Sequence, residues 1–337
     1  MRSRCSRLWL IALLALGACD PAVPDEDPDP GPDPWAAGLV LEFQAVRYGD
    51  FVDLDVRPAS AGEWTLVGLT QGGAIHLGRN IGTTWTTCGT VSSHTRAVAL
   101  SGDLVFTGGT GAQFSLFDHD CAFVRGGTAS LPATGPLSGF DVADAYFLGS
   151  SVYVALARPD DRDGALVSGS IPASTDQSIG WRNERPGTQP TSYRSLMLQS
   201  GTVAGIHTTP GSQTVSIPGL IQGGGDNWQS LELPEAFLGR VPFRMARRSN
   251  SSGSSGLFLV DLSGPVVGDR DHRLFAARAV GRPLSVREVE VRGFSIEGVI
   301  DGVPQAVQVD EDGHVWLAGD IGIFRSTARL PNAMPPW

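Results

Sequence analysis

The segment Trp64–Leu77 reads WTLVGLTQGGAIHL, two short apolar runs on either side of the turn residues Gln71-Gly72-Gly73. Apolar runs of about four to eight residues bounded by glycine are typical of β-strands joined in a hairpin. No longer stretch of the folded part keeps the period of an amphipathic helix. The segment therefore predicts an all-β fold, and its recurrence decides which one.

This strand-turn-strand pattern recurs along the chain. Its units begin at Trp64, Leu104, Val152, Val203, Leu257 and Val315, 40 to 58 residues apart. A third run with an aromatic residue often follows, as at Trp85 and Trp181. Repeats of this length with four strands each are typical of β-propeller blades. We expect a propeller of four-stranded antiparallel blades over residues 35–337, with six blades, or seven if a long unit contains another.

The ends of this domain predict how the ring closes. The sixth unit runs almost directly into the C-terminus and lacks an outer strand, whereas Leu39–Val46 is a spare strand near the start. Pairing the two would remove open sheet edges.

The repeats contain a degraded motif. Residues 78–85, GRNIGTTW, resemble the Asp-box of BNR-type repeats, Ser-x-Asp-x-Gly-x-Thr-Trp, found in sialidases, sortilin ectodomains and photosystem assembly factors. Two later units keep part of it, and residues 312–326 resemble a strand-turn-strand unit of regulator-type propellers. The resemblance implies capped hairpin turns and tryptophans packed between blades. The residues implicated are Asn80, Gly82, Thr84, Trp85, Asp176, Trp181, Gly225 and Trp228. It implies an architecture and not an activity.

The N-terminal residues predict export. Three arginines precede the apolar run Leu8–Leu16, which is far shorter than the roughly 20 residues of a membrane-spanning helix. The following Leu16-Gly17-Ala18-Cys19 resembles the lipobox of bacterial lipoproteins. We therefore expect residues 1–18 to be a removable signal peptide and Cys19 to carry lipid, an ordinary signal peptide being the alternative. The protein would then be anchored in the cell envelope, on the periplasmic side of a membrane or at the cell surface.

The segment after Cys19 predicts a linker. Asp20–Asp33 contains six acidic residues, five prolines and no aromatic residue. Such a segment buries too little apolar surface to fold. Residues 19–34 are thus expected to tether the propeller to the membrane.

Charge narrows the choice of partner. The chain has a formal net charge of −10, and all 25 of its basic residues are arginine. An acidic domain lacks the basic surface excess that nucleic acid requires, so no nucleic-acid partner is expected. Without lysine, Schiff-base chemistry and the P-loop lysine are excluded.

The cysteines predict one disulfide. Of four, Cys5 would leave with the signal peptide and Cys19 would carry lipid. Cys88 and Cys121 remain in an oxidising compartment, where pairing is expected. Two separately buried thiols are the alternative.

No catalytic set emerges from the sequence. Sialidases use a tyrosine nucleophile with a glutamate, an aspartate acid/base and three arginines. The best candidates here are Arg47-Tyr48 with Asp50, and Tyr193-Arg194, without the family's early Arg-Ile-Pro element. The other tyrosines are Tyr146 and Tyr153.

No metal site or cofactor is expected either. Acidic turns occur at Asp160, Asp161 and Asp163, at Asp269 and Asp271, and at Asp310, Glu311 and Asp312. None has the spacing of a calcium loop. The six histidines (His76, His94, His119, His207, His272 and His314) form no close pair in the sequence.

Two functions are compatible with these features. The first is a non-catalytic module that binds an envelope protein or a glycan. The second is a carbohydrate-active hydrolase or lyase with its site in the propeller channel. The expected inner strands offer Asp53, Asp55, Arg57, Asp141, Asp144, Arg194, Arg244 and Arg247. We expect these charges to be ion-pair partners or solvated rather than catalytic.

Overall fold

A computed structural model of the chain describes residues 39–57, 64–79, 83–92, 94–102, 104–132, 134–159, 163–174, 177–184, 192–199, 202–210, 216–224, 227–232, 242–247, 257–261, 273–278, 285–296 and 300–330. The chain divides into the units Met1–Asp33 and Pro34–Trp337, and every described residue belongs to the second. These residues form strands and one 3-10 turn, η1 (Thr110–Ala112). None of their helical segments could span a membrane.

Four of the sheets have four antiparallel strands in chain order. The first contains β2 (Phe51–Val56), β3 (Trp64–Thr70), β4 (Ala74–Arg79) and β5 (Thr84–Thr90). The second contains β6 (Thr95–Leu100), β7 (Leu104–Gly109), β8 (Gln113–Asp118) and β9 (Phe123–Thr128). The third contains β12 (Asp141–Leu148), β13 (Ser151–Ala157), β14 (Gly164–Ser170) and β15 (Gly180–Asn183). The fourth contains β16 (Ser192–Gln199), β17 (Thr202–Pro210), β18 (Ser216–Gly224) and β19 (Asn227–Glu232).

The last sheet has eight strands, in the order β20-β21-β22-β23-β1-β28-β27-β26. Its strands are β20 (Pro242–Arg247), β21 (Leu257–Asp261), β22 (Arg273–Arg278), β23 (Ser285–Arg292), β1 (Leu39–Tyr48), β28 (Gly322–Arg329), β27 (His314–Gly319) and β26 (Pro304–Val309). Two short hairpins, β10 (Ser130–Leu131) with β11 (Gly135–Pro136) and β24 (Ser295–Ile296) with β25 (Ile300–Asp301), lie outside these sheets.

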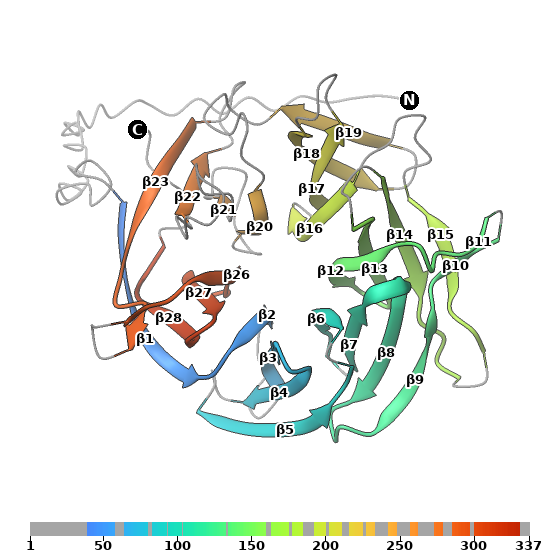
Figure 1. Ribbon diagram of the computed structural model, residues 1–337, viewed down its shortest axis with the longest axis horizontal. Helices are drawn as coiled ribbons and strands as arrows, with labels where there is room; N and C mark the ends of the chain where they lie inside the picture. The colour runs from blue at the N-terminus through green and yellow to red at the C-terminus, as the bar shows by residue number, and fades with distance from the viewer. Residues whose placement is uncertain are drawn as a thin grey trace, which may run out of the picture. The chain divides into compact units, whose positions relative to one another are not determined.

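The sheets surround a common centre (Figure 1). Strand β2 contacts β6, β6 contacts β12, and the series continues through β16, β20 and β26 back to β2. These six strands form the inner wall, and the later strands of each sheet lie farther out. The fold is thus the predicted all-β propeller. Six blades would give this cycle of six inner strands if the eight-stranded sheet counts as two blades. The number of blades stays a prediction.

The strand next to the inner one in each unit is the run that the sequence predicted as recurrent. Alternate residues of a strand face opposite sides of a sheet, so each sheet presents apolar faces to both neighbours. Val67 and Leu69 of the first sheet pack with Val98 and Leu100 of the second in one buried cluster. Similar clusters lie between the second and third sheets, the third and fourth sheets, and the first and last sheets, and this burial stabilises the ring.

Strand β1 closes the ring as predicted. Its second half pairs antiparallel with β28, from Phe43 opposite Ser326 to Tyr48 opposite Gly322. Its first half also pairs in parallel with β23, from Leu39 opposite Val289. The sequence did not predict this second pairing, which joins two four-stranded groups into one sheet.

Candidate functional site

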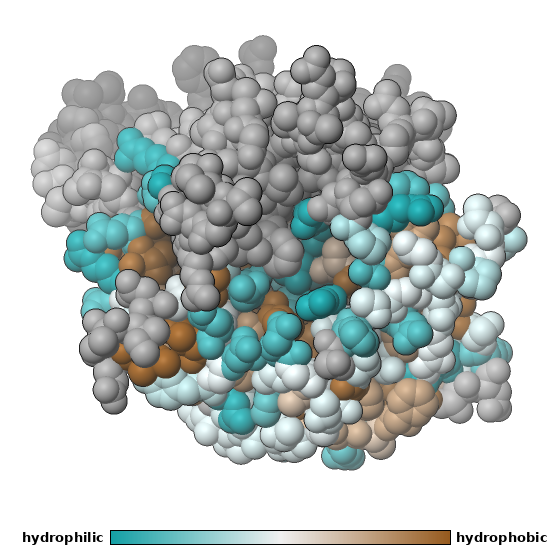
Figure 2. Space-filling view, in the orientation of Figure 1, coloured by the Kyte–Doolittle hydropathy of each residue, from teal (hydrophilic) through white to brown (hydrophobic). Residues whose placement is uncertain are grey.

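The inner strands share a β-bulge at one position. In each, the pairing register shifts directly before one residue: Asp53, Ala97, Asp144, Ser195, Arg244 or Ala306. A bulge adds an unpaired residue and redirects the side chains beside it. Four of the six equivalent residues are polar, and all four polar ones are buried. Hydrophilic residues are visible near the centre of the ring, beside hydrophobic areas (Figure 2).

These polar side chains bond one inner strand to the next. The Asp53 carboxylate accepts the Val98 N–H of β6 at 2.8 Å, and the Asp144 carboxylate accepts the Leu196 N–H of β16 at 2.8 Å. The Ser195 hydroxyl accepts the Met245 N–H of β20 at 3.1 Å. In each case the donor follows the equivalent position of the next strand. The same bond therefore recurs between neighbouring inner strands where the bulge residue is Asp or Ser, and it fixes those sheets in register.

The same pattern continues one step along β2. Asp55 accepts the Leu100 N–H at 2.8 Å and pairs with Arg57 at 3.1 Å. Asp144 also accepts an amide of its own strand, the Ala145 N–H, at 2.8 Å. These acids act as acceptors for backbone amides that would otherwise be unpaired inside the ring.

Arg244 bonds to the neighbouring strand β16 and also reaches two strands, β12 and β2, that are not its neighbours. Its guanidinium donates to the carbonyl oxygens of Ala143 on β12 at 2.7 Å and Arg194 on β16 at 3.1 Å. Its Nε lies 3.6 Å from an Asp53 oxygen on β2, and both side chains are about 95% buried. One cation therefore compensates the carboxylates at the centre of the ring.

Burial dominates the titration of these acids. It raises the pKa of Asp53 to about 7, with Arg244 opposing the rise and Asp144 adding to it. Burial also raises the pKa of Asp144, against Arg244 and the bonds from Leu196 and Ser195. Burial raises the pKa of Asp55 as well, and Arg57 opposes it. The pKa of Arg194 is lowered by burial and by nearby Arg244.

The charged groups of this centre bond to the protein itself. General acid–base catalysis needs a group within hydrogen-bond reach of a substrate proton. Asp53 and Asp144 are instead buried against backbone amides, and Arg244 lies against them. The predicted ion-pair role is thus found for Asp53 with Arg244 and for Asp55 with Arg57. Asp141 is half-buried and accepts the Gly111 N–H at 3.1 Å, and the Arg247 side chain lies outside the description.

The sialidase-like candidates do not converge. Arg47 lies near His76 Nδ1 at 3.2 Å and 5.0 Å from the Trp85 ring. Tyr48 is 61% exposed, whereas Tyr193 is buried between the third and fourth sheets. The pKa of Asp50 is raised by partial burial and by Asp320.

The sequence did not predict a row of polar residues on the third sheet. Tyr153 lies opposite Ser168, and Ser168 lies opposite Arg182, on β13, β14 and β15. Both Ser168 and Arg182 donate to the buried carboxylate of Glu184. Burial and then Glu184 raise the pKa of Tyr153, which keeps the phenol protonated. The pairing register that unites these residues is not readable from their spacing.

The acidic turns that the structure describes have structural roles. Asp310 accepts the His314 N–H at 2.8 Å and the Trp316 indole N–H at 2.9 Å, and pairs with Arg325. Asp163 pairs with Arg158 at 3.2 Å. Asp160, Asp161, Asp269, Asp271 and His272 lie outside the described residues. Within the described part, no three His, Cys, Asp or Glu residues form a possible metal site.

Two tryptophans of the Asp-box-like segments lie between sheets. Trp181 is buried and meets Phe114 of the second sheet edge to face at 5.3 Å. Trp85 packs on the cluster formed by the first and last sheets. Thr84 begins β5 opposite Arg79. Asn80, Gly82, Asp176, Gly225 and the Trp228 side chain lie outside the described residues, so the resemblance stays a prediction.

The predicted disulfide is present. Cys88 of β5 bonds to Cys121, and their Cα atoms are 4.9 Å apart. Cys121 lies in the turn between β8 and β9, two residues before β9 begins. The bond joins the outer parts of the first two sheets.

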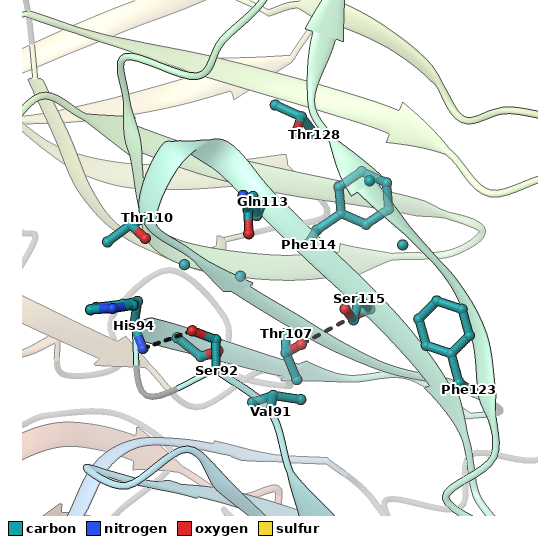
Figure 3. A pocket seen from close by; sticks show the side chains of 15 residues that line it. Val91, Ser92, His94, Thr107, Thr110, Gln113, Phe114, Ser115, Phe123 and Thr128 are labelled. Atoms are coloured by element: carbon teal, nitrogen blue, oxygen red, sulfur yellow. Dashed lines mark hydrogen bonds between the residues drawn. The ribbon is translucent and has the colours of Figure 1, made fainter.

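A cavity of about 350 Å³ lies on the second sheet, beside this disulfide (Figure 3). Its walls come from β6 to β9 and from the residues after β5. They are Val91, Ser92, His94, Thr95, Thr107, Gly108, Gly109, Thr110, Gln113, Phe114, Ser115, Phe123, Gly126, Gly127 and Thr128. No motif in the sequence predicts this cavity, because its Ser, Thr and Gln residues become neighbours only in the fold.

No protein-family model and no curated protein matches the chain. Among solved structures, the RRP9 WD40 repeats are 10% identical with a TM-score of 0.51, covering 86% of this chain and 97% of that one. A Thermus thermophilus protein provisionally assigned as an oxidoreductase (glucose dehydrogenase) is 16% identical with a TM-score of 0.51, covering 85% and 99%.

The extracellular domain of a provisionally assigned two-component system of B. thetaiotaomicron is 13% identical with a TM-score of 0.48. The match covers 82% of this chain, which spans only 32% of that one. Likeness at such low identity says nothing of activity. The comparisons therefore establish a β-propeller fold, in agreement with the sheets described above.

Proposed function

We propose that this protein is a lipid-anchored envelope protein whose β-propeller is a non-catalytic module for binding a protein or a glycan. One observation carries the proposal. The polar side chains at the bulge position of the inner strands bond to backbone amides or to one another, as shown by Asp53, Asp144, Ser195 and Arg244. The centre of the ring thus acts as a rigid support, and the outer surface is left for recognition.

The alternative is a carbohydrate-active hydrolase or lyase. It is favoured only by the row of Tyr153, Ser168 and Arg182 beside Glu184, because a tyrosine near a glutamate is the nucleophile pair of sialidases. A raised Tyr153 pKa opposes this use. No ring of arginines for a substrate carboxylate accompanies the row among the described residues.

The two functions are separated by incubating the purified mature protein with a panel of fluorogenic glycosides, sialosides included. A non-catalytic module releases no fluorophore above the rate of a Tyr153→Phe, Glu184→Gln variant. Turnover that disappears in that variant would establish the hydrolase instead. Turnover abolished by Asp53→Asn would do the same for the ring centre.

The anchor has its own test. The lipobox-like residues before Cys19 support lipidation of its thiol, followed by removal of residues 1–18. Radioactive palmitate should label the wild type in a bacterial host, and the Cys19→Ala variant should take up no label. Equal labelling of both proteins, or a wild type found wholly in the aqueous phase of a detergent partition, would contradict the anchor.

A further inference from the structure

The cavity beside the disulfide lacks charge. Its 15 lining residues contain no Asp, Glu or Arg, although 18% of the whole chain is charged. The surface over β5 and β9 is mostly pale in Figure 2, which corresponds to intermediate hydropathy. A charged ligand would lose hydration on entering without gaining an opposite charge. The cavity therefore favours an uncharged ligand.

Polar groups on one face of the sheet remain available for that ligand. Gln113 lies opposite Thr128, and Ser115 lies opposite Gly126, so these residues share a face of β8 and β9. Among the described residues, the side chains of Gln113, Ser115 and Thr128 make no hydrogen bond. They supply amide and hydroxyl groups, which both donate and accept. Thr110 and His94 line the same cavity, as Figure 3 shows.

An aromatic ring lies beside these polar groups. Phe123 is 63% exposed, and its edge-to-face partner Phe117 is 6.0 Å away. An exposed aromatic ring gains free energy when a ligand covers it. A ligand that suits this wall needs an apolar face and several hydroxyl groups at its edge.

The floor of the cavity is bare backbone. A Cβ at Gly126 would lie 3.0 Å from the Phe114 carbonyl oxygen and 3.2 Å from the Phe123 ring. Any side chain there would also occupy the space in front of Ser115. Glycine thus keeps the floor flat and the Phe123 ring accessible.

The disulfide holds both sides of the cavity in place. Cys88 lies three residues before Val91, and Cys121 lies two residues before Phe123. A wall that is already ordered loses less conformational entropy when a ligand binds. The volume of about 350 Å³ is at the lower end of the range for small-molecule sites, about 300–1,000 Å³.

We propose that this cavity binds an uncharged carbohydrate of one or two sugar rings. Sugar rings combine an apolar C–H face, which packs on Phe123, with edge hydroxyls, which bond to Gln113, Ser115 and Thr128. The proposal rests on the binding function proposed above and gives it a site and a ligand class.

Saturation-transfer NMR on the mature lipoprotein in detergent micelles tests it. The probes are methyl glucoside, N-acetylglucosamine, cellobiose and maltose, with glucuronate and glucosamine as charged analogues of the same ring. At least one neutral sugar should bind ten-fold or more tightly than its charged analogues. Phe123→Ala, and separately Gln113→Leu with Thr128→Val, should each weaken that binding at least ten-fold. Tyr48→Ala is the matched control, since it removes another exposed aromatic ring, and should leave binding unchanged.

The outcomes separate this inference from the proposed function. Sugar binding that survives both pocket variants overturns the site while the binding module stands. Failure of every neutral sugar to bind, or preference for glucuronate, overturns the ligand class. Cleavage of cellobiose or maltose in the same spectra would instead overturn the non-catalytic function.

Discussion

Polar side chains have opposite roles at the centre of the ring and in the cavity beside the disulfide, which we call the rim. At the centre, Asp53, Asp144 and Arg244 are charged residues that are almost fully buried and bonded to neighbouring strands. At the rim, Gln113 and Thr128 are uncharged and partly open, and no bond to the protein engages their side chains within the described residues. The difference shows that the charged residues at the centre support the fold, whereas the uncharged polar residues of the cavity are available to a ligand.

Removing the cation at the centre should have the largest effect. In Arg244→Met, the Asp53 and Asp144 carboxylates remain buried without the guanidinium that compensates them. The free energy of unfolding should fall by about 3–5 kcal/mol, measured by urea denaturation. Arg273→Met is the control, because its pair with Glu288 is partly exposed to solvent and contributes about 1 kcal/mol or less. Equal losses in the two variants would show that the central network does not support the ring.

Opening the disulfide tests how far the rim depends on a covalent bond. The Cys88→Ala, Cys121→Ala variant frees a loop of 33 residues, for which chain entropy gives a loss of up to about 4 kcal/mol. Thermal unfolding with and without reductant measures it. Wild type in reductant should approach the variant, and a variant as stable as the oxidised wild type would contradict this assignment.

The two regions should also differ in their response to pH. Because the folded pKa of Asp53 is about 7, against an ordinary value of 3.8 for an aspartate, the unfolded chain loses its proton first as pH rises. Stability from this group is fully present below about pH 4 and is lost as pH rises to about 7. The slope is about 1.4 kcal/mol per pH unit for one proton. Asp55 and Asp144 act in the same direction.

Urea denaturation at a series of pH values measures this slope. Asp53→Asn should flatten it, whereas Phe123→Ala should leave it as in the wild type. A wild-type slope equal to that of Asp53→Asn would show that Asp53 is ionised throughout the range.

The smallest effect is expected at the rim. Phe123 is mostly exposed, so Phe123→Ala should change the free energy of unfolding by about 0.5 kcal/mol or less while removing sugar binding. A loss comparable to that of Arg244→Met would mean that Phe123 supports the fold, and the distinction between the two regions would fail.

The sequence predicts the fold from repeated features and misses contacts that depend on register. The spare strand at Leu39–Val46 was predictable because the last unit lacked an outer strand. Its parallel pairing with β23 was not, since the sequence does not show which sheet edges remain free.

The site shows the same limit. Asp53, Asp144 and Arg244 were identifiable as inner-strand charges and candidate ion-pair partners, but their hydrogen bonds to the backbone of other inner strands were not. The signal that could have shown it is an alignment of the inner strands at the bulge, where Asp53, Ala97, Asp144, Ser195, Arg244 and Ala306 coincide. The cavity had no such signal, because Gln113 and Thr128 become neighbours only through the pairing of β8 with β9.

The pairing of β1 with β28 also determines when strand β1 can fold. Phe43 is among the first described residues, and its partner Ser326 is among the last. Contacts between such distant residues form slowly, because the chain between them must be ordered first. Strand β1 therefore waits, with its backbone groups unpaired, until nearly the whole chain is available. Whatever protects the folding chain from aggregation must act on this segment longest, because both of its partner strands, β23 and β28, come late in the sequence.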